Sequence, residues 1–338
     1  MYSRLSGRPG WEFVGFASRE LVAAGADWFP GRIVDSGLSC DNRAQWAWGE
    51  LTGVARAARD AGAHLIHAPA NFGPPRPPVP MVLTLHDVLA FKRPEFLPSR
   101  VGVIPTRFLI SRAARAASHI ITVSDTAKSD ILEVTGRQAS DVSVVHPGSS
   151  GATPAGTGDA PRSGLFSLGN RMPHKNFPRL IEAMSLIPES ERPRLVISGS
   201  HADDPLLAEV ERRGLQRWVD LRGWLTRAEV DELYATSAAV VFPTLFEGFG
   251  LPVLEGMERG CPVVCSDIPV LREVGGPAAA YFDPLDPRSI ASVIQSCLTD
   301  SARRTRMSAA GLARASTFTW DATAEGTLAA FERTVERA

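Results

Sequence analysis

The sequence predicts an α/β fold in which two doubly wound domains, each built on a parallel sheet, face each other across a cleft. Apolar strand-like runs alternate with helical patterns along the 338 residues, as βαβ units require. Residues 151–163 interrupt the alternation with a stretch rich in Gly, Ala and Pro, which is typical of a linker. The chain therefore divides into a first domain at residues 1–150, the linker, and a second domain at residues 164–320.

In the first domain, short apolar runs predict strands and longer amphipathic stretches predict helices. Strands are expected near residues 11–17, 64–68, 81–85, 119–124 and 142–146, and helices near residues 43–61, 100–117 and 126–136.

The second domain repeats the pattern, and two long helices close the chain. Its strands are expected near residues 165–169, 194–200, 219–223, 238–243, 261–266 and 278–282. The final segment, residues 321–338, is predicted as a helix that crosses back to the first domain.

Composition excludes several classes of protein. The net charge of −1 argues against a dedicated nucleic-acid binder, which usually carries a basic excess. The four cysteines lack metal-ligand spacing, and no apolar run has the length of a transmembrane helix. No charged-then-apolar signal segment opens the chain. We therefore expect a cytoplasmic protein.

The most informative motif follows the strand-like run at residues 238–243. Residues 247–255 are Glu-Gly-Phe-Gly-Leu-Pro-Val-Leu-Glu. Pro252 suits the first position of a helix, and Gly260 suits the residue just past its end. A short helix is therefore expected to begin just after a strand, where ligands bind in open α/β sheets.

The mouth of this helix predicts a phosphate site. The amides of Phe249, Gly250 and Leu251 are expected at the positive end of the helix dipole, where anions bind. Glu247 in the loop and Glu255 about one turn inside the helix flank it. The pattern fits a nucleotide-sugar, with Glu247 at the sugar and Glu255 at the ribose hydroxyls. For an isolated pair of glutamates, the alternative is a pair of solvated charges at a helix terminus.

Two cations follow the strand expected at residues 165–169. Arg171 and Lys175 stand where the strand ends, and Asn176 is predicted to cap the next helix. Two positive charges at this place would neutralise a departing diphosphate. The alternative is an ordinary basic loop.

A third polar pair follows the strand expected at residues 81–85. His86 and Asp87 stand directly after the apolar run. A lone histidine is more often structural, and Asp87 alone would be a turn or cap residue. The position at a strand end favours a functional role for His86.

Together and in this order, these motifs resemble those of the retaining GT-B glycosyltransferases, specifically the bacterial α-glycosyltransferases that include lipopolysaccharide mannosyltransferases. The run at residues 247–255 resembles their Glu-x-seven-Glu signature. The resemblance covers nearly the whole chain and implies two Rossmann-like domains, of which the second binds the donor. It implies that Arg171 and Lys175 hold the donor diphosphate and that His86 reaches toward the donor sugar.

The resemblance implies a reaction in polysaccharide biosynthesis. A hexose, with mannose from GDP-mannose as the leading expectation, moves from a nucleotide diphosphate sugar to a hydroxyl of a glycan or lipid-linked acceptor. Retention at the anomeric carbon is implied, with peripheral association at the inner face of the membrane. No cofactor beyond the co-substrate is expected. No metal site is expected either, because the sequence has no Asp-x-Asp element.

The start of the chain departs from the family pattern. Family members usually open with a strand and a Gly-rich loop, whereas this chain begins just before what should be the second strand. The first domain is therefore expected to be incomplete and to expose a sheet edge and apolar surface. The alternative function is a catalytically impaired remnant, or a partner subunit, that binds a nucleotide-sugar without turnover. A sugar epimerase on the same scaffold is disfavoured by the two glutamates.

Overall fold

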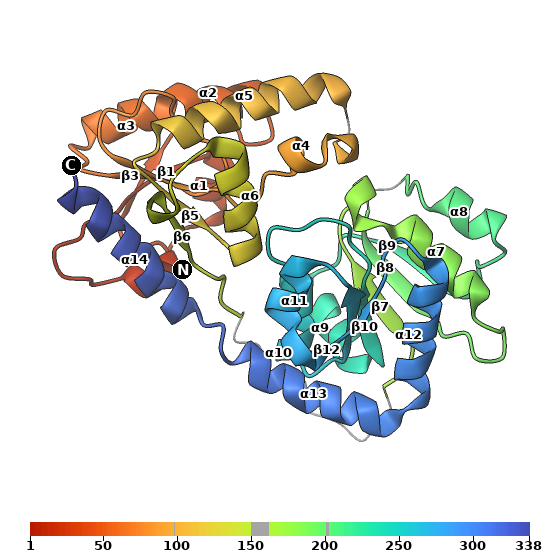
Figure 1. Cartoon of the computed structure of the whole chain (residues 1–338). Coiled ribbons are helices and arrows are strands. Elements are labelled where there is room, and N and C mark those ends of the chain that lie inside the picture. Colours follow the sequence, from red (N-terminus) through yellow and green to blue (C-terminus); the bar gives the residue numbers. More distant parts are fainter. Residues whose placement is uncertain (98, 150–161, 201–202) are drawn as a thin grey trace. The chain divides into compact units, whose positions relative to one another are not determined.

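The structure is a computed structural model, and it describes all residues except 98, 150–161 and 201–202 (Figure 1). Most of the predicted linker lies outside the described residues. The chain forms two compact units. The first comprises Met1–Pro94, Ser99–Gly148 and Thr319–Ala338, and the second comprises Glu95–Pro98 and Ser149–Phe318.

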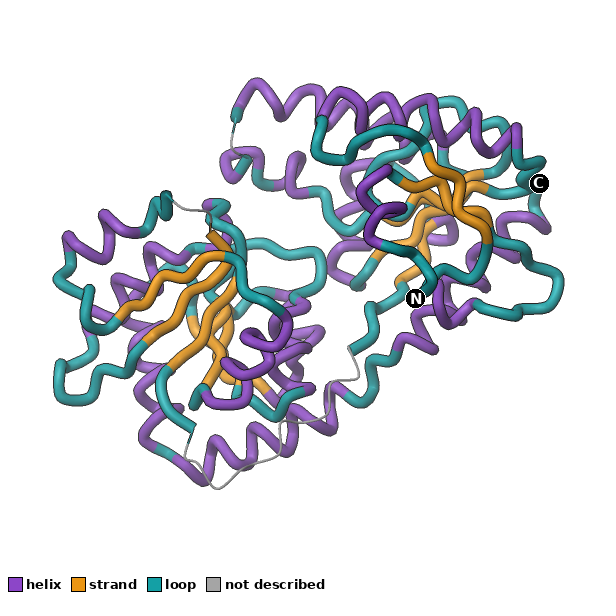
Figure 2. Tube along the Cα trace, turned by 180° about the vertical axis from the view of Figure 1, so that it is seen from behind, coloured by secondary structure: helices purple, strands orange, loops and turns teal. Residues whose placement is uncertain are grey.

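Parallel sheets form the centre of the first unit, which Figure 2 shows with its strands in orange. One sheet pairs β1 (Val14–Ala17) with β2 (Arg32–Asp35), and the other has the order β3 (Ile66–Ala68), β4 (Met81–Thr84), β5 (His119–Thr122) and β6 (Val142–Val144). The sequence did not predict β2, which has four residues and no buried side chain.

The three helical ranges predicted for the first unit are present, and the unit has further short helices that were not predicted. The helices of this unit include η1 (Tyr2–Leu5), α1 (Arg19–Ala24), α2 (Arg43–Trp48), α3 (Val54–Asp60), α4 (Leu89–Lys92), α5 (Arg100–Ala116) and α6 (Asp125–Thr135). A turn of π-helix joins α2 to α3, so the helix predicted near residues 43–61 is continuous but distorted.

The first residues of the chain cover part of the first unit's core. Leu5, in η1, is fully buried against Val82 and Ile121 of the four-stranded sheet. The hydroxyl of Tyr2 lies 2.5 Å from Nδ1 of His67 on β3. The N-terminal turn therefore covers this part of the sheet, and the expectation of an incomplete first domain stays a prediction.

The last helix, α14 (Trp320–Glu336), also belongs to the first unit. Ala324, Leu328 and Phe331 recur at helical spacing and pack into the cluster that contains Leu5. The hydroxyl of Thr323 donates a hydrogen bond to the carbonyl of His146. The two ends of the chain therefore share one core.

The second unit contains a six-stranded parallel sheet with the order β12-β11-β10-β7-β8-β9. The strands are β7 (Leu165–Leu168), β8 (Leu195–Ser200), β9 (Val219–Gly223), β10 (Ala239–Phe242), β11 (Val263–Ser266) and β12 (Ala279–Phe282). Every strand predicted in this half is present.

Helices on both sides of the sheet belong to the second unit, and its short η6 spans Gly276–Ala278. The others include α7 (Phe177–Leu186), α8 (Leu207–Arg212), α9 (Arg227–Thr236), α10 (Leu251–Glu258), α11 (Pro269–Gly275), α12 (Pro287–Thr299), α13 (Ser301–Ala315) and the short η5 (Pro173–Lys175).

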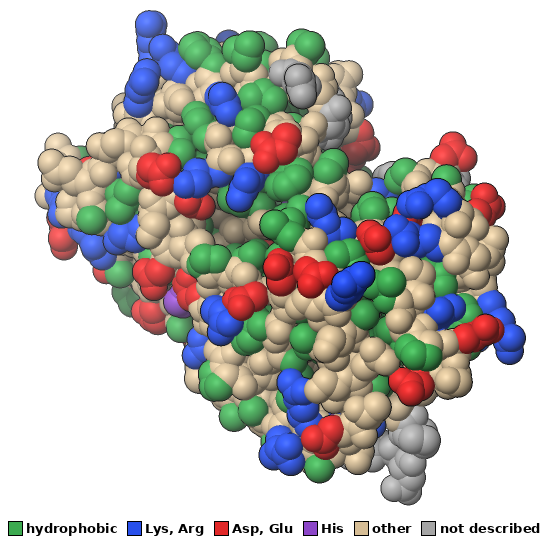
Figure 3. Space-filling model, turned by 45° about the vertical axis from the view of Figure 1, so that its right-hand side comes forward, with side chains coloured by type: hydrophobic (Ala, Val, Ile, Leu, Met, Phe, Trp, Pro, Cys, Tyr) green, Lys and Arg blue, Asp and Glu red, His purple; other side chains and the backbone are tan. Residues whose placement is uncertain are grey.

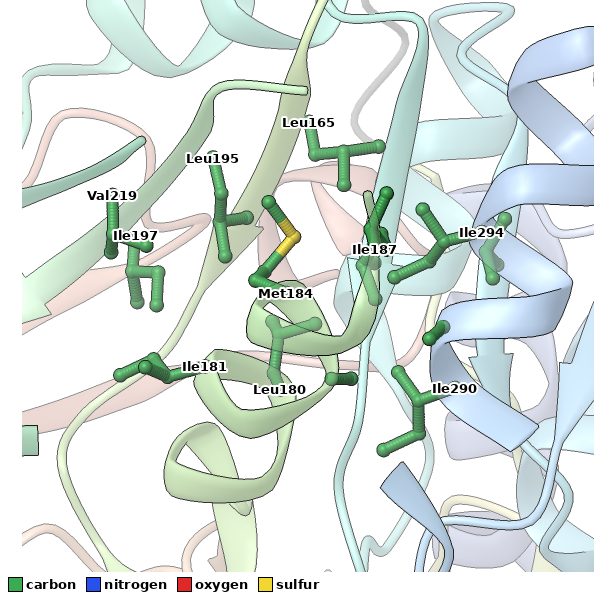
Figure 4. Packing of buried hydrophobic residues seen from close by; sticks show 14 of the residues in the cluster. Leu165, Leu180, Ile181, Met184, Ile187, Leu195, Ile197, Val219, Ile290 and Ile294 are labelled. Carbon is green, nitrogen blue, oxygen red and sulfur yellow. The ribbon is translucent and has the colours of Figure 1, made fainter. Parts of the chain in front are cut away.

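The core of the second unit forms where α7 and α12 pack on the sheet (Figure 4). Leu180 and Met184 of α7 approach Leu195 of β8, and Ile290 and Ile294 project from α12. All five side chains are fully buried. This core fixes the strands whose carboxyl ends carry the predicted motifs.

Charged groups of both signs are interspersed on the face shown in Figure 3, with apolar side chains between them. The near-neutral composition agrees with this distribution.

Candidate functional site

The strand order of the second sheet reverses between β7 and β10. The chain runs from β7 outward to β9 and then returns to place β10 on the other side of β7. In doubly wound sheets, the loops on either side of such a switch point diverge and leave room for a ligand. The loop after β7 carries Arg171 and Lys175, and the loop after β10 carries Glu247. Two predicted motifs therefore follow adjacent strands.

The loop after β10 enters α10 as predicted. Gly250 has a φ of +105°, and a Cβ there would lie 2.5 Å from Cδ2 of Leu271, so no other residue fits without a shift. Pro252 is the second helical residue, not the first as predicted. Gly260, at φ +62°, follows the helix as predicted. The amides at the start of α10 therefore lie at a helix N-terminus, the kind of position where anions bind in other proteins.

Lys175 and Glu247 form an ion pair at the switch point. Lys175 Nζ lies 2.6 Å from Glu247 Oε1, and the two side chains are 14% and 15% exposed. The ammonium also lies 5.2 Å from the centroid of the Phe242 ring, within the range of a cation–π contact. The structure therefore pairs Lys175, which was predicted to bind the donor diphosphate, with Glu247, which was predicted to contact the donor sugar.

Every N–H group of the Arg171 guanidinium donates a hydrogen bond within the protein. Its guanidinium donates to both carboxylate oxygens of Asp204, with Nη2 at 2.6 Å from Oδ2. It also donates to the carbonyls of Gly169, Ser198 and Ile197. These bonds use all five donors of an arginine. The side chain is 8% exposed and ties the end of β7 to the end of β8.

Asp204 is the partner that sequence reasoning missed. Burial opposes its ionisation, but the hydrogen bonds from Arg171 and from the amide of Leu206 outweigh that cost and lower the pKa of the carboxyl. The signal in the sequence was an Asp-Asp pair soon after the strand predicted at residues 194–200.

Glu255 lies on α10 with a defined set of neighbours. The hydroxyl of Tyr234, a fully buried residue of α9, lies 3.2 Å from Glu255 Oε2. Arg227 Nη1 lies 3.8 Å from Oε1, and the Glu255 side chain is 25% exposed. Glu255 therefore contacts two side chains of α9 and stays partly exposed to solvent.

His174 and Asn176, the two neighbours of Lys175 in the sequence, are both buried. His174 is 7% exposed, and its Nδ1 has no hydrogen-bond partner among the described residues. Burial and the adjacent Lys175 charge lower its pKa to about 4, so the ring is neutral near pH 7. Asn176 stands before α7 at φ +60°. The prediction that its side chain caps this helix is wrong, because the side chain makes no capping hydrogen bond. It donates instead to the carbonyls of Pro243 and Pro284.

His86 belongs to the first unit and follows β4. Its Nε2 lies 2.9 Å from the carbonyl of Pro69, which only accepts, so Nε2 carries the proton and Nδ1 is left for another group. The backbone amide of His86 donates to Asn71 Oδ1. Asp87 accepts from the amide of Leu89 and opens α4, which is the turn role considered for it.

No helix among the described residues is both long enough and apolar enough to cross a membrane.

Two family descriptions match the chain. "Glycosyltransferase Family 4" matches residues 14–149, and "Glycosyl transferases group 1" matches residues 161–314. The O-antigen chain mannosyltransferase B of Escherichia coli is 32% identical over 292 residues, which cover 82% of this chain and 76% of the relative. The chain is a GT-B glycosyltransferase.

Other relatives of this glycosyltransferase are longer or more distant. The serotype-specific mannosyltransferase WbdA of Escherichia coli is 31% identical over 68% of this chain, which spans only 29% of the relative. Among solved structures, WaaG, a glycosyltransferase involved in lipopolysaccharide biosynthesis, superposes with a TM-score of 0.70 at 18% identity. This match covers 90% of this chain and 87% of WaaG and supports the GT-B fold.

Proposed function

We propose that this GT-B glycosyltransferase moves mannose from GDP-mannose to a hydroxyl of a glycan or lipid-linked acceptor, with retention at the anomeric carbon. The observation that carries the proposal is the Lys175–Glu247 pair at the switch point, directly before the mouth of α10. The names of the relatives support mannose as the sugar.

The donor diphosphate is assigned to Lys175 and to the amides of Phe249, Gly250 and Leu251. As the bond from the anomeric carbon to the diphosphate oxygen breaks, negative charge grows on that oxygen, and these groups stabilise it. Arg171 is given an indirect part: it holds the loop after β7 in place while Lys175 contacts the phosphate.

The sugar and the ribose are assigned to the two glutamates. Glu247 orients a sugar hydroxyl and stabilises positive charge on the oxocarbenium-like sugar, and Glu255 accepts hydrogen bonds from the ribose hydroxyls. His86 from the first unit is assigned to the donor sugar through its Nδ1. The acceptor hydroxyl attacks from the face that the diphosphate leaves, and the diphosphate oxygen takes the proton.

The proposal includes metal independence and action at the cytoplasmic face of a membrane. Metal independence is proposed because Lys175 and the amides at the start of α10 would supply the positive charge that a divalent ion supplies in other glycosyltransferases. Donor turnover is expected to persist in excess chelator. Loss of activity with chelator, followed by recovery with magnesium or manganese, would show that the phosphate assignment is wrong.

The experiment that tests the proposal separates binding from turnover. The full chain is incubated with a panel of nucleotide-sugars, and affinity and slow donor hydrolysis are measured independently. Tight binding of GDP-mannose together with hydrolysis is expected. Binding without hydrolysis or transfer would support the alternative of a catalytically impaired partner, and preference for another donor would overturn the assignment of mannose.

A further inference from the structure

His86 lies beside a residue with an unusual backbone conformation. Asn71, in the loop that follows β3, has a φ of +62°, in the left-handed region. Among the described residues, only Asn176 shares this region without being a glycine, and it adjoins Lys175. Non-glycine residues held in this region cluster at functional sites, where the surrounding structure maintains the strain. Asn71 has no part in the function proposed above, so its conformation calls for an explanation of its own.

The side chain of Asn71 continues the pairing between the ends of β3 and β4. The two strands pair in parallel as far as Ala68 and Leu83. Beyond this point, the amide of Asn71 donates to the carbonyl of Thr84 at 2.9 Å. Oδ1 of Asn71 accepts from the amide of His86 at 2.7 Å. One residue therefore binds the chain after β4 at two places, and the second is the backbone of His86 itself.

The same loop holds the imidazole of His86. The carbonyl of Pro69, two residues before Asn71, lies 2.9 Å from Nε2. Because a carbonyl only accepts, this contact places the ring proton on Nε2 and leaves Nδ1 as an acceptor. His86 is exposed, so burial does little to fix its rotamer. The hydrogen bonds from the loop therefore determine where Nδ1 lies.

Packing anchors this loop on the first unit. The ring of Phe72 meets the ring of Trp46 on α2 edge to face, with 5.2 Å between their centroids. Gly73 lies so close to the core that an added Cβ would stand 3.0 Å from Ala68 Cβ and from Met81 Sδ. The carboxamide next to Phe72 is therefore carried by a packed loop, as a group that positions another side chain requires.

We infer that Asn71 is a positioning residue for His86. Its carboxamide fixes the backbone at His86, the Pro69 carbonyl fixes the tautomer, and Nδ1 is presented as an acceptor to a hydroxyl of the donor sugar. The inference rests on the proposed function, which assigns His86 to that sugar. Asn suits the position because it tolerates the left-handed backbone and also supplies the acceptor. Asp offers both properties, and Gly offers only the first.

The first measurement needs no donor. The full chain with isotope-labelled histidine is observed by long-range proton–nitrogen NMR at alkaline pH, and His86→Gln identifies the signals of this ring. In the wild type, Nε2 is expected to carry the proton. In Asn71→Gly the two tautomers are expected to mix, because the ring is no longer held against Pro69. Asn71→Asp keeps the left-handed backbone and the acceptor, and it is expected to keep the wild-type signals.

The second measurement is steady-state turnover of GDP-mannose. Asn71→Gly is expected to lower kcat by about 10- to 100-fold while KM stays within about twofold, because a displaced Nδ1 costs contacts made in the transition state. Asn71→Asp is expected to restore most of kcat. In the His86→Gln background, adding Asn71→Gly is expected to lower kcat no further, since residues that act as a unit are not additive.

The matched control is Asn42→Gly. Asn42 also belongs to the first unit, and its Oδ1 accepts from the amides of Ala44 and Gln45 at the start of α2. The control removes the same kind of hydrogen bond, made to a helix start and not to His86, and is expected to leave the His86 signals and kcat unchanged. Because Gly adopts the left-handed backbone without strain, Asn71→Gly is expected to fold, and thermal unfolding checks both variants.

Unchanged His86 signals in Asn71→Gly would overturn the inference. So would a loss of kcat that Asn71→Gly repeats in the His86→Gln background, because that loss would come from the loop and not from His86. The two proposals fail separately. Absence of donor turnover in the wild type would remove the proposed function, and the NMR signals would still show whether Asn71 holds His86.

Discussion

At the scale of single residues, Glu247 and Glu255 stand in different environments, and this predicts different duties. Glu247 is paired with Lys175, and Glu255 is held by Tyr234. Glu247→Gln is expected to lower kcat by roughly 10²–10³-fold, since an electrostatic contact made in the transition state is lost. Glu255→Gln is expected to weaken donor binding by about 1–3 kcal/mol through lost hydrogen bonds to a charged group.

Steady-state kinetics and donor binding measure these effects, with Glu211→Gln as the control because Glu211 is an exposed residue of α8. Equal and small effects at Glu247 and Glu255 would return both to the interpretation as solvated helix-terminus charges.

Substitutions at Arg171 and Lys175 are also expected to have different effects, one on stability and the other on donor affinity. Arg171→Leu leaves Asp204 as an unpaired, largely buried carboxylate and is expected to cost about 3–5 kcal/mol of unfolding free energy. Lys175→Met is expected to act chiefly on donor affinity. Chemical denaturation and donor titration distinguish the two. The double variant Arg171→Leu/Asp204→Leu is expected to recover much of the stability, because neither charge then remains buried alone.

That outcome would leave Arg171 as a structural residue whose effect on catalysis is indirect. If Arg171→Leu instead kept full stability and lost donor affinity, the guanidinium would have to leave Asp204 to contact the phosphate, as the sequence alone suggested.

Tyr234 and Asp204 were not predicted from the sequence, and each contacts a residue that was predicted. Tyr234 and Asp204 touch Glu255 and Arg171 across the fold, and nothing in their local sequence specifies those partners. The positions of Glu247, Lys175 and the start of α10 were predictable because each lies in a loop or helix that follows a strand-like run, where such sheets bind ligands, whereas their roles stay predictions.

At the scale of elements, the geometry of α10 depends on Gly250. Its left-handed backbone disfavours a side chain, and an added Cβ would also approach Leu271 to 2.5 Å. Gly62 provides the control, because it has a φ of +64° and nothing within 4 Å of an added Cβ. Gly62→Ala isolates the backbone strain, about 1–3 kcal/mol. Gly250→Ala is expected to cost more, and also to weaken donor binding by displacing the mouth of α10.

Unfolding free energies and donor affinities of the two variants are compared. If Gly250→Ala were no more costly than Gly62→Ala and bound the donor normally, the close fit of α10 against Leu271 would not matter for the site.

Strand and helix positions were largely predictable at this scale. β10 and β11 are buried on both faces and were recognisable as short, β-branched apolar runs between polar, proline or glycine residues, although such runs show no alternation. β2 was missed because it has no buried residue and lacks that pattern. The cap at Asn176 was wrong because its amide is used by two carbonyls distant in sequence, which local rules do not foresee.

At the scale of the whole molecule, the first unit depends on packing that involves both ends of the chain. Burial, with a smaller contribution from the charge of His86, lowers the pKa of His67 to about 3. Burial, with the charges of Arg333 and Arg337, lowers that of His119 to about 4. Both folded-state values lie below the ordinary value of 6.5, so the unfolded chain binds more protons from about pH 6.5 down to about 4 for His119 and down to about 3 for His67. The first unit is therefore expected to lose stability as pH falls through that window.

Calorimetry of the full chain at a series of pH values measures this loss. His67→Gln is expected to reduce the pH dependence of the unfolding temperature of the first unit, while His64→Gln, at an exposed position, is expected to leave it unchanged. An identical pH dependence in His67→Gln and the wild type would show that the buried histidine is not the cause.

The anomeric configuration of the product tests the central claim most directly. The full chain is incubated with GDP-mannose, in which the sugar is α-linked to the diphosphate, and an acceptor, and the transferred mannose is examined by proton NMR. The account predicts an α-mannoside formed by wild type and, at a rate roughly 10²–10³-fold lower, by Glu247→Gln. A β-mannoside, or transfer that does not depend on Glu247, would contradict it.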